Sequence, residues 1–135
     1  MFIKPVEGKI TSDFGYREKP LPGATSNHSG IDIGVPLGTP VKAVAAGTVI
    51  AACGGMRGYG NGVFIDHGKI NGKRVVSEYG HLSRFLVRVG DKVKQGQIIA
   101  KSGSTGISSG PHLHITIREN NIPVSPKKYI NFEQA

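Results

Sequence analysis

The sequence has little cysteine and no tryptophan: Cys53 is the only cysteine among 135 residues. A single thiol excludes an intramolecular disulfide, a cysteine-based zinc site and a paired-thiol redox site. Because its neighbours in the sequence are alanine and glycine, Cys53 is predicted to pack as a small apolar residue.

Long apolar runs are also missing. The longest weakly polar stretch, residues 44–53, contains Gly47 and Thr48 and is far shorter than the roughly 20 residues of a membrane helix. Residues 1–14 carry charged side chains and lack an apolar centre, so we expect no secretory signal there. Export would then need another route, and we expect no insertion into a membrane.

Acidic residues are scarce. Nine Asp and Glu stand against 17 Lys and Arg, which gives a formal net charge of +8 and favours encounter with a polyanion. The basic residues are spread along the chain without an aromatic RNA-binding signature, so we expect no nucleic-acid partner. A bacterial wall, with its carboxylates and phosphate polymers, fits the charge.

The composition predicts an all-β fold with scarce helix. Twenty glycines divide the chain into short apolar segments, which is typical of a two-sheet antiparallel sandwich or a partly closed barrel. Residues 1–135 are predicted to form one domain, with a core over about 8–118 and a tail over 119–135. Loops at 19–30, 54–61 and 102–110 are predicted to wall a groove.

Alternating apolar residues mark the strands. In 112–118 every second side chain is apolar, so Leu113, Ile115 and Ile117 are predicted to face the core. Asn71-Gly72 separates the segments 63–66 and 75–82 and predicts a hairpin between them. Further short strands are expected at 40–44, 47–52, 87–89 and 97–101.

Two pairs of polar residues are candidates for chemistry. His112 and His114 lie on one face of the predicted strand, where the alternative interpretation is a solvent-facing polar pair. His28 and Asp32 are four apart, which puts them on one side in a strand or a helical turn; Gly30 favours the extended form. Together the pairs supply the imidazole and carboxylate ligands of a catalytic zinc site with one open position.

Two further histidines are ambiguous. His81 lies at the end of the predicted strand 75–82, and His67 follows the strand 63–66. Each is either a half-buried histidine at a strand end or a site residue. We expect only one of the two to serve chemistry.

These residues resemble the lysostaphin-type, or LytM-like, zinc endopeptidases that degrade peptidoglycan. His28-Ser-Gly-Ile-Asp32 resembles the first metal motif of that family, Tyr79-Gly-His81-Leu its central histidine motif, and Gly110-Pro-His112-Leu-His114 its closing His-x-His motif. The order and spacing match from about residue 10 to 118. Gly80 stands where alanine is common and Ile115 where an aromatic residue is common, and neither change is expected to affect the metal chemistry.

The resemblance implies both a fold, a barrel-sandwich hybrid of the duplicated-hybrid-motif type, and a function. It makes His28, Asp32 and His114 ligands of one Zn²⁺ per chain and leaves His81 and His112 as unliganded catalytic histidines, whereas His67 receives no role. Zinc would activate a water molecule for attack on a peptide bond, and the two histidines would move the proton or stabilise the oxyanion. Which histidine is the base, and whether a stem-peptide or cross-bridge bond is cut, stays open.

Two alternatives come from other classes. One is a non-catalytic relative that binds the wall or activates a hydrolase. The other is a carrier or phosphotransfer domain, because residues 87–99 have the turn pattern of lipoyl-like domains. The expected setting is the cell wall, as a phage lysin, a virion-associated enzyme or an excised catalytic domain, with the oligomeric state open.

Overall fold

The fold is known from a computed structural model, which describes residues 1–16, 27–56, 58–105 and 110–133. Within these ranges the regular elements are strands and one short 3₁₀ helix, as the composition predicts: β1 (Lys9–Ser12), β2 (Gly15–Tyr16), β3 (Asn27–His28), β4 (Ile31–Gly34), β5 (Pro40–Lys42), β6 (Gly47–Met56), β7 (Gly60–Ile70), β8 (Lys73–Gly80), β9 (Leu82–Phe85), β10 (Lys92–Val93), β11 (Ile98–Ser102), β12 (His112–Glu119), β13 (Ile122–Val124) and η1 (Pro126–Lys128). Among the described residues, no helix has the length and apolar character needed to cross a bilayer.

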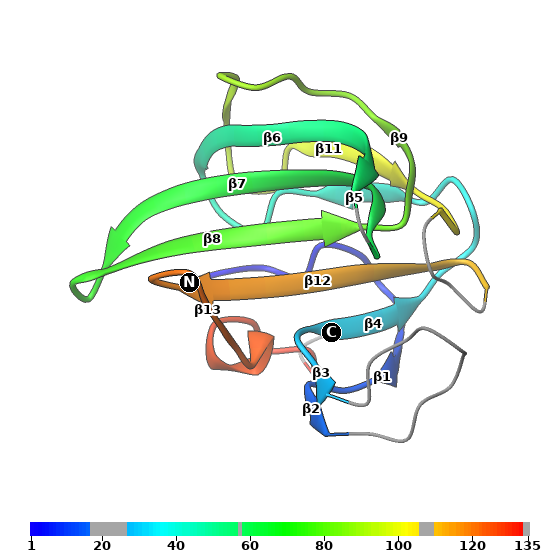
Figure 1. The fold of residues 1–135 in the computed structure, drawn as a ribbon, viewed down its shortest axis with the longest axis horizontal. Coiled ribbons are helices and arrows are strands. Elements are labelled where there is room, and N and C mark those ends of the chain that lie inside the picture. Colours follow the sequence, from blue (N-terminus) through cyan, green and yellow to red (C-terminus); the bar gives the residue numbers. More distant parts are fainter. Residues whose placement is uncertain (17–26, 57, 106–109, 134–135) are drawn as a thin grey trace.

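The strands form two main antiparallel sheets. The large sheet has the order β1-β4-β12-β8-β7-β6-β10, with β13 also paired to β12, and the small sheet has the order β5-β11-β9. Strands β2 and β3 form a separate pair. The small sheet lies behind the large one, and the two do not close into a barrel (Figure 1). This architecture confirms the predicted all-β sandwich.

The core lies between the sheets. The side chains of Leu113, Ile115 and Ile117 are fully buried, as the alternation in β12 predicts. They join one apolar cluster with Val41 and Ile99 of the small sheet. Burying each of these large side chains stabilises the fold by about 1.5–3 kcal/mol relative to leaving it exposed. The core therefore fixes the direction in which the alternate residues of β12 point.

The hairpin predicted at Asn71-Gly72 is confirmed. Strands β7 and β8 pair in antiparallel register with Ile70 opposite Lys73. Both turn residues have positive φ, 51° for Asn71 and 81° for Gly72, which is the geometry of a two-residue type I′ turn. The two long strands supply the centre of the large sheet.

Two local predictions are wrong. Residues 87–89 are not a strand, because Asp91 caps a turn through a 2.9 Å hydrogen bond from the Arg88 backbone N–H. The strand of this region is β9, which begins directly after His81. Cys53 is exposed rather than packed, since the glycine-rich end of the β6–β7 hairpin offers few side chains to cover it.

The segments predicted as loops and tail have different outcomes. Residues 17–26 and 106–109, which belong to two predicted groove loops, lie outside the described residues. The segment 54–61 is mostly hairpin, because β6 continues to Met56 and β7 starts at Gly60. In the tail, β13 pairs with β12, and Ile130 is buried and bridges Phe2 near the amino terminus.

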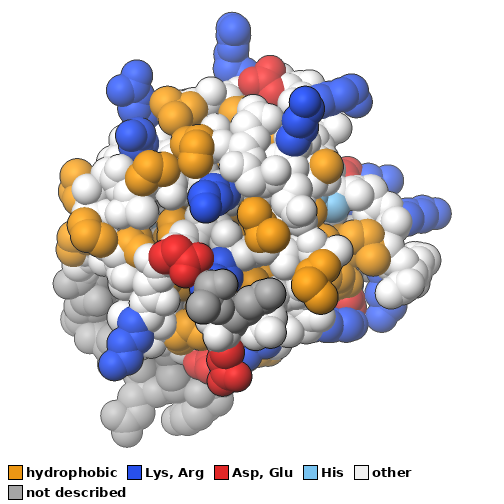
Figure 2. Space-filling model, turned by 180° about the vertical axis from the view of Figure 1, so that it is seen from behind, with side chains coloured by type: hydrophobic (Ala, Val, Ile, Leu, Met, Phe, Trp, Pro, Cys, Tyr) orange, Lys and Arg blue, Asp and Glu red, His pale blue; other side chains and the backbone are white. Residues whose placement is uncertain are grey.

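Positive side chains are prominent on the face opposite to the view of Figure 1. Lys and Arg project around the edge of this face, between smaller apolar patches and few acidic groups (Figure 2). The net charge of +8 is therefore visible as exposed basic groups. An extended polyanion meets such a surface with favourable electrostatics.

Candidate metal centre

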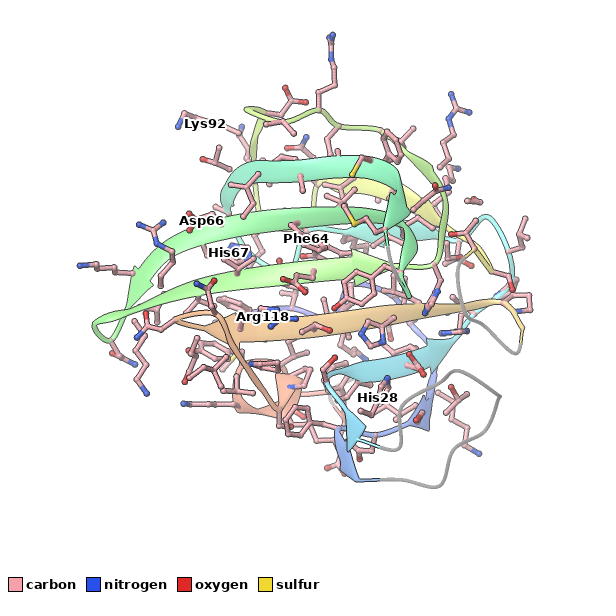
Figure 3. All side chains as sticks on the ribbon, viewed as in Figure 1. His28, Phe64, Asp66, His67, Lys92 and Arg118 are labelled. Carbon is pink, nitrogen blue, oxygen red and sulfur yellow. The ribbon has the colours of Figure 1, made fainter. Side chains whose placement is uncertain are left out.

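Four of the histidines singled out above meet with Asp32 around the neighbouring strands β4, β12 and β8 of the large sheet. His114 in β12 lies opposite Asp32 of β4 and opposite Gly80 of β8. His28 ends β3 and reaches the same point from the other side of β4 (Figure 3). Strand pairing therefore brings together residues that are far apart in the sequence.

Three side chains converge closely enough to share one ion. The possible ligand atoms of His28, Asp32 and His114 all lie within 4.8 Å of one another. His114 Nδ1 is 2.9 Å from Asp32 Oδ1 and 3.2 Å from His28 Nε2, and His28 Nε2 is 3.5 Å from Asp32 Oδ2. His28 and Asp32 do not share one strand, because a bend at Ser29 and Gly30 separates β3 from β4. Both nevertheless face the predicted site.

In His28 and His114, the ring nitrogen that points away from the candidate metal position has a hydrogen-bond partner. His28 Nδ1 lies 3.0 Å from the backbone oxygen of Asp13, which can only accept, so this nitrogen carries the proton and Nε2 presents a lone pair. His114 Nε2 lies 2.8 Å from Thr116 Oγ1. Metal-bound histidines ordinarily have such outer partners. Imidazole nitrogens and a carboxylate that converge on one point fit a divalent cation, and zinc in particular.

Electrostatics within the cluster favour the charged carboxylate. Burial alone would raise the pKa of Asp32, but hydrogen bonds and charge interactions with His114 and His28 outweigh it and hold the pKa below its ordinary value. Burial lowers the pKa of His114, in spite of the hydrogen bond to Asp32. An ionised Asp32 beside a neutral His114 is the protonation state that binds a metal ion.

His81 and His112 lie side by side next to this cluster. Their ring centroids are 4.7 Å apart, and the His81 ring is 5.8 Å from that of His114. His81 Nδ1 donates to the backbone oxygen of Thr105, and His112 Nδ1 donates to that of Gly110 at 2.8 Å. In the neutral form of each ring, the other nitrogen, Nε2, therefore carries no proton and has a lone pair. Burial, with smaller effects from the neighbouring histidines, lowers the pKa of His81 to about 4.

The backbone at His81 explains how it reaches the site. Its φ is 61°, a left-handed conformation that is uncommon for residues other than glycine. The chain leaves the large sheet after Gly80 and enters the small sheet at Leu82. The sequence predicted one strand through residue 82, and this turn divides it. The strained residue thus lies at the change of sheet and beside the candidate metal ligands.

Comparisons with known proteins agree on one family. Residues 26–126, which include all five site residues, match Peptidase family M23. The chain belongs to this peptidase family. It is 48% identical over 125 residues to the DD-carboxypeptidase/endopeptidase Mpg of Neisseria meningitidis, which covers 92% of the chain and 28% of that protein.

Solved M23 structures have the same fold. The catalytic domain of the antimicrobial peptidase lysostaphin from Staphylococcus simulans superposes with a TM-score of 0.79 at 35% identity, covering 90% of the chain and 91% of that domain. A zinc-containing peptidase from Vibrio cholerae gives the same TM-score at 37% identity, covering 91% of the chain and 38% of that protein. The chain thus spans a small part of the curated Mpg relative but nearly all of an isolated M23 catalytic domain.

His67 lies apart from the centre of this M23 domain. Its Nδ1 donates to the backbone oxygen of Ala46 at 2.8 Å, and its Nε2 is 2.8 Å from Ser77 Oγ. The ring also packs against Phe2, with centroids 5.0 Å apart. The described contacts of His67 are therefore with the interior between β6, β7 and β8 (Figure 3).

Sequence reasoning missed several residues around the M23 centre. Tyr59 stacks near His114, with ring centroids 5.1 Å apart, and burial together with Glu78 raises the pKa of Tyr59 to about 12. A Cβ on Gly80 would lie 3.2 Å from Tyr59 Cγ. The glycine expected to leave the site unaffected thus makes room for a tyrosine that touches a candidate ligand. The motif spacing gives no signal for Tyr59.

An open cleft of about 830 Å³ adjoins the M23 centre on the exposed side of the large sheet. Tyr59 and Ser29 connect it to the metal cluster, since Tyr59 contacts His114 and Ser29 follows His28. Apolar and charged side chains from four strands and the turn after β12 complete its lining: Ile50, Met56, Phe64, Val76, Glu78, Arg118 and Asn121.

Proposed function

We propose that this M23 domain, residues 1–135, is a zinc-dependent endopeptidase that hydrolyses peptide bonds of bacterial peptidoglycan. One observation carries the proposal: His28, Asp32 and His114 direct their ligand atoms at one point, within 4.8 Å of one another. Three protein ligands and one open position are the composition of a catalytic zinc site, whereas structural sites use four protein ligands.

The proposed ion is Zn²⁺, one per chain. Two imidazole nitrogens and one carboxylate oxygen are typical zinc ligands, and the Vibrio cholerae relative is described as containing zinc. When bound, the ion supplies Lewis acidity to the scissile carbonyl and lowers the pKa of water toward neutrality. The outer bonds to the Asp13 carbonyl and the Thr116 hydroxyl hold the two imidazoles in place.

His81 and His112 are the proposed catalytic residues. In the neutral form the Nδ1 proton of each ring is donated to a backbone oxygen, so Nε2 is the nitrogen that accepts a proton from the attacking water. In His112 this nitrogen lies 3.5 Å from Asp32 Oδ1, beside the proposed ligands. After protonation the same nitrogen donates a hydrogen bond to the charge that develops on the substrate oxygen. The 4.7 Å between the rings lets one act as base while the other stabilises this charge.

The cleft beside the centre is the proposed binding surface for one side of the peptide. Its mixed apolar and charged lining suits a short peptide with polar termini, and Tyr59 of this lining contacts the ring of His114. Mpg is named as a DD-carboxypeptidase/endopeptidase and lysostaphin as an antimicrobial peptidase, which supports a wall peptide as substrate. This proposed activity is compatible with three biological settings: a secreted wall hydrolase, a phage lysin or a virion-associated enzyme.

The test is digestion of purified sacculi. The wild-type protein with zinc is expected to release peptide fragments whose masses identify the cleaved bond, and a chelator is expected to stop the release. His114→Ala should be inactive with or without zinc, while His67→Gln, which changes a histidine outside the centre, should stay active. Zinc binding without any cleavage would contradict the proposal and favour a non-catalytic wall-binding module.

A further inference from the structure

The hydroxyl of Thr116 connects a candidate zinc ligand to a second buried group. Thr116 Oγ1 lies 2.8 Å from His114 Nε2 and 3.0 Å from the hydroxyl of Tyr59. Thr116 is fully buried, so these groups replace water as its partners. A hydroxyl has one proton to donate. Which neighbour receives it decides whether His114 Nε2 must donate to Thr116 or accept from it.

Tyr59 settles this choice through Glu78. The Tyr59 hydroxyl donates to Glu78 Oε1 at 2.9 Å, and Arg118 Nε donates to Glu78 Oε2 at 2.9 Å. Glu78 is 5% exposed, and an ionised carboxylate can only accept. The single phenolic proton of Tyr59 is therefore used toward Glu78. Tyr59 must then accept the proton of Thr116, and Thr116 must accept the proton of His114 Nε2.

We propose that Arg118, Glu78, Tyr59 and Thr116 form a hydrogen-bond chain that fixes the tautomer of His114. With the proton held on Nε2, Nδ1 presents its lone pair to Asp32 and His28, which is the form that binds a metal ion. The four residues are positioning residues: they act through His114. The inference rests on the zinc site proposed above and adds a determinant of its affinity. Three of the four residues, Tyr59, Glu78 and Arg118, also line the adjoining cleft.

The sheet is built to hold this chain. Thr116 of β12 pairs directly with Glu78 of β8, and Phe64 of β7 pairs with Glu78 on its other side. Tyr59 reaches over them from the β6–β7 hairpin and meets Phe64 edge to face, with centroids 5.8 Å apart. Figure 3 shows Arg118 between β8 and β12, where it closes the far end of the chain.

Replacing Glu78 by glutamine is expected to reverse the donor–acceptor direction of these hydrogen bonds, with almost no change in side-chain volume. Arg118 Nε still needs an acceptor, so the amide oxygen of the new side chain faces Arg118 and its NH₂ group faces Tyr59. Tyr59 then accepts from the amide and donates to Thr116, and Thr116 donates to His114 Nε2. This direction favours a proton on His114 Nδ1, which blocks the ligand atom.

The experiment measures the Zn²⁺ dissociation constant by competition with a chromophoric chelator. Thr116→Val, which removes the acceptor, is expected to weaken zinc binding by about 10–100-fold, and Glu78→Gln by about tenfold. Thr116→Ser should restore binding. The double variant Thr116→Val with Glu78→Gln should bind no more weakly than Thr116→Val alone, because both changes act through the same hydroxyl.

Glu119→Gln is the matched control. Glu119 is a buried carboxylate on β12 that is paired with Lys73 and Lys128 and bonded to Tyr129, as Glu78 is paired with Arg118 and Tyr59. We expect the zinc affinity of the Glu119→Gln variant to equal that of the wild type.

A direct observation of the tautomer complements the affinities. In ¹⁵N spectra of the zinc-loaded wild type, His114 should carry its proton on Nε2.

The outcomes separate this inference from the proposed function. A wild-type protein that binds no zinc contradicts both. If the wild type binds zinc and both Glu78→Gln and Thr116→Val bind it within about twofold of the wild type, the hydrogen-bond chain alone is overturned. A His114 proton found on Nδ1 with zinc bound overturns it as well. If Thr116→Val fails to fold, Tyr59→Phe takes its place, because loss of the phenol frees the Thr116 proton for His114 and is expected to weaken binding in the same direction.

Discussion

Gly30 lies directly against the backbone of Ile115. A Cβ atom added at Gly30 would stand 2.3 Å from the Ile115 carbonyl oxygen, 2.7 Å from Thr116 Oγ1 and 3.0 Å from His114 Nε2. The bend between His28 and Asp32 therefore passes the strand of the other ligand at a distance that only glycine permits. The spacing of the first motif depends on this close approach.

We predict that Gly30→Ala destabilises the protein and weakens zinc binding. A backbone oxygen cannot move aside as a flexible side chain can, so the expected loss in free energy of unfolding is about 1–3 kcal/mol or more. Gly34→Ala on the same strand is the control, because its Cβ would meet chiefly the Thr11 methyl, at 3.0 Å. Urea unfolding of both variants checks the prediction, and equal stabilities would contradict it.

A second prediction concerns metal removal. An ion that binds the folded state alone stabilises it by about 2.7 kcal/mol at a free concentration of 100 times its dissociation constant. We expect this increment for the wild type and its loss in His28→Ala, because that change removes one of three ligands. Urea titrations with zinc and with a chelator measure it. An undiminished zinc effect in His28→Ala would exclude His28 as a ligand.

The sequence motifs anticipated the convergence of His28, Asp32 and His114, but they did not anticipate the residues that surround this cluster. The period of two in β12 puts His112 and His114 on the face opposite the apolar Leu113 and Ile115, so local pattern is sufficient there. Contacts of Tyr59 with Thr116 and Glu78 depend instead on the register of three strands and on a bulged hairpin, which leave no periodic mark. The exposure of Cys53 likewise follows from where its hairpin ends.

A third prediction tests the cleft. Ile50 lines it and is 46% exposed, so Ile50→Asp is expected to change stability by less than about 0.5 kcal/mol. If the cleft binds peptide, the variant raises KM severalfold on soluble wall fragments while zinc affinity stays that of the wild type. Ile98→Asp, at an exposed apolar residue of the small sheet, is the control. Equal KM values for the two variants would remove the cleft from the binding surface.

The last prediction concerns pH and His67. Burial lowers the pKa of His67 below its ordinary value, while a histidine in the unfolded chain titrates near 6.5. Between these two pKa values the unfolded state binds more protons, so the contribution of His67 to stability is complete above about pH 6.5 and is lost as the pH falls through the folded-state pKa. The slope from one group is at most about 1.4 kcal/mol per pH unit.

His67→Gln isolates this contribution from that of the other histidines. The variant should have a shallower fall in free energy of unfolding between pH 7.5 and pH 5 than the wild type, both measured with a chelator so that metal binding adds nothing. Because His67 bonds Ala46 and Ser77 and no residue of the candidate centre in the described structure, zinc affinity at pH 7.5 should be the same in both proteins. Parallel pH profiles would show that His67 titrates alike in the folded and unfolded chains, and its burial between β6, β7 and β8 would then have no part in acid sensitivity.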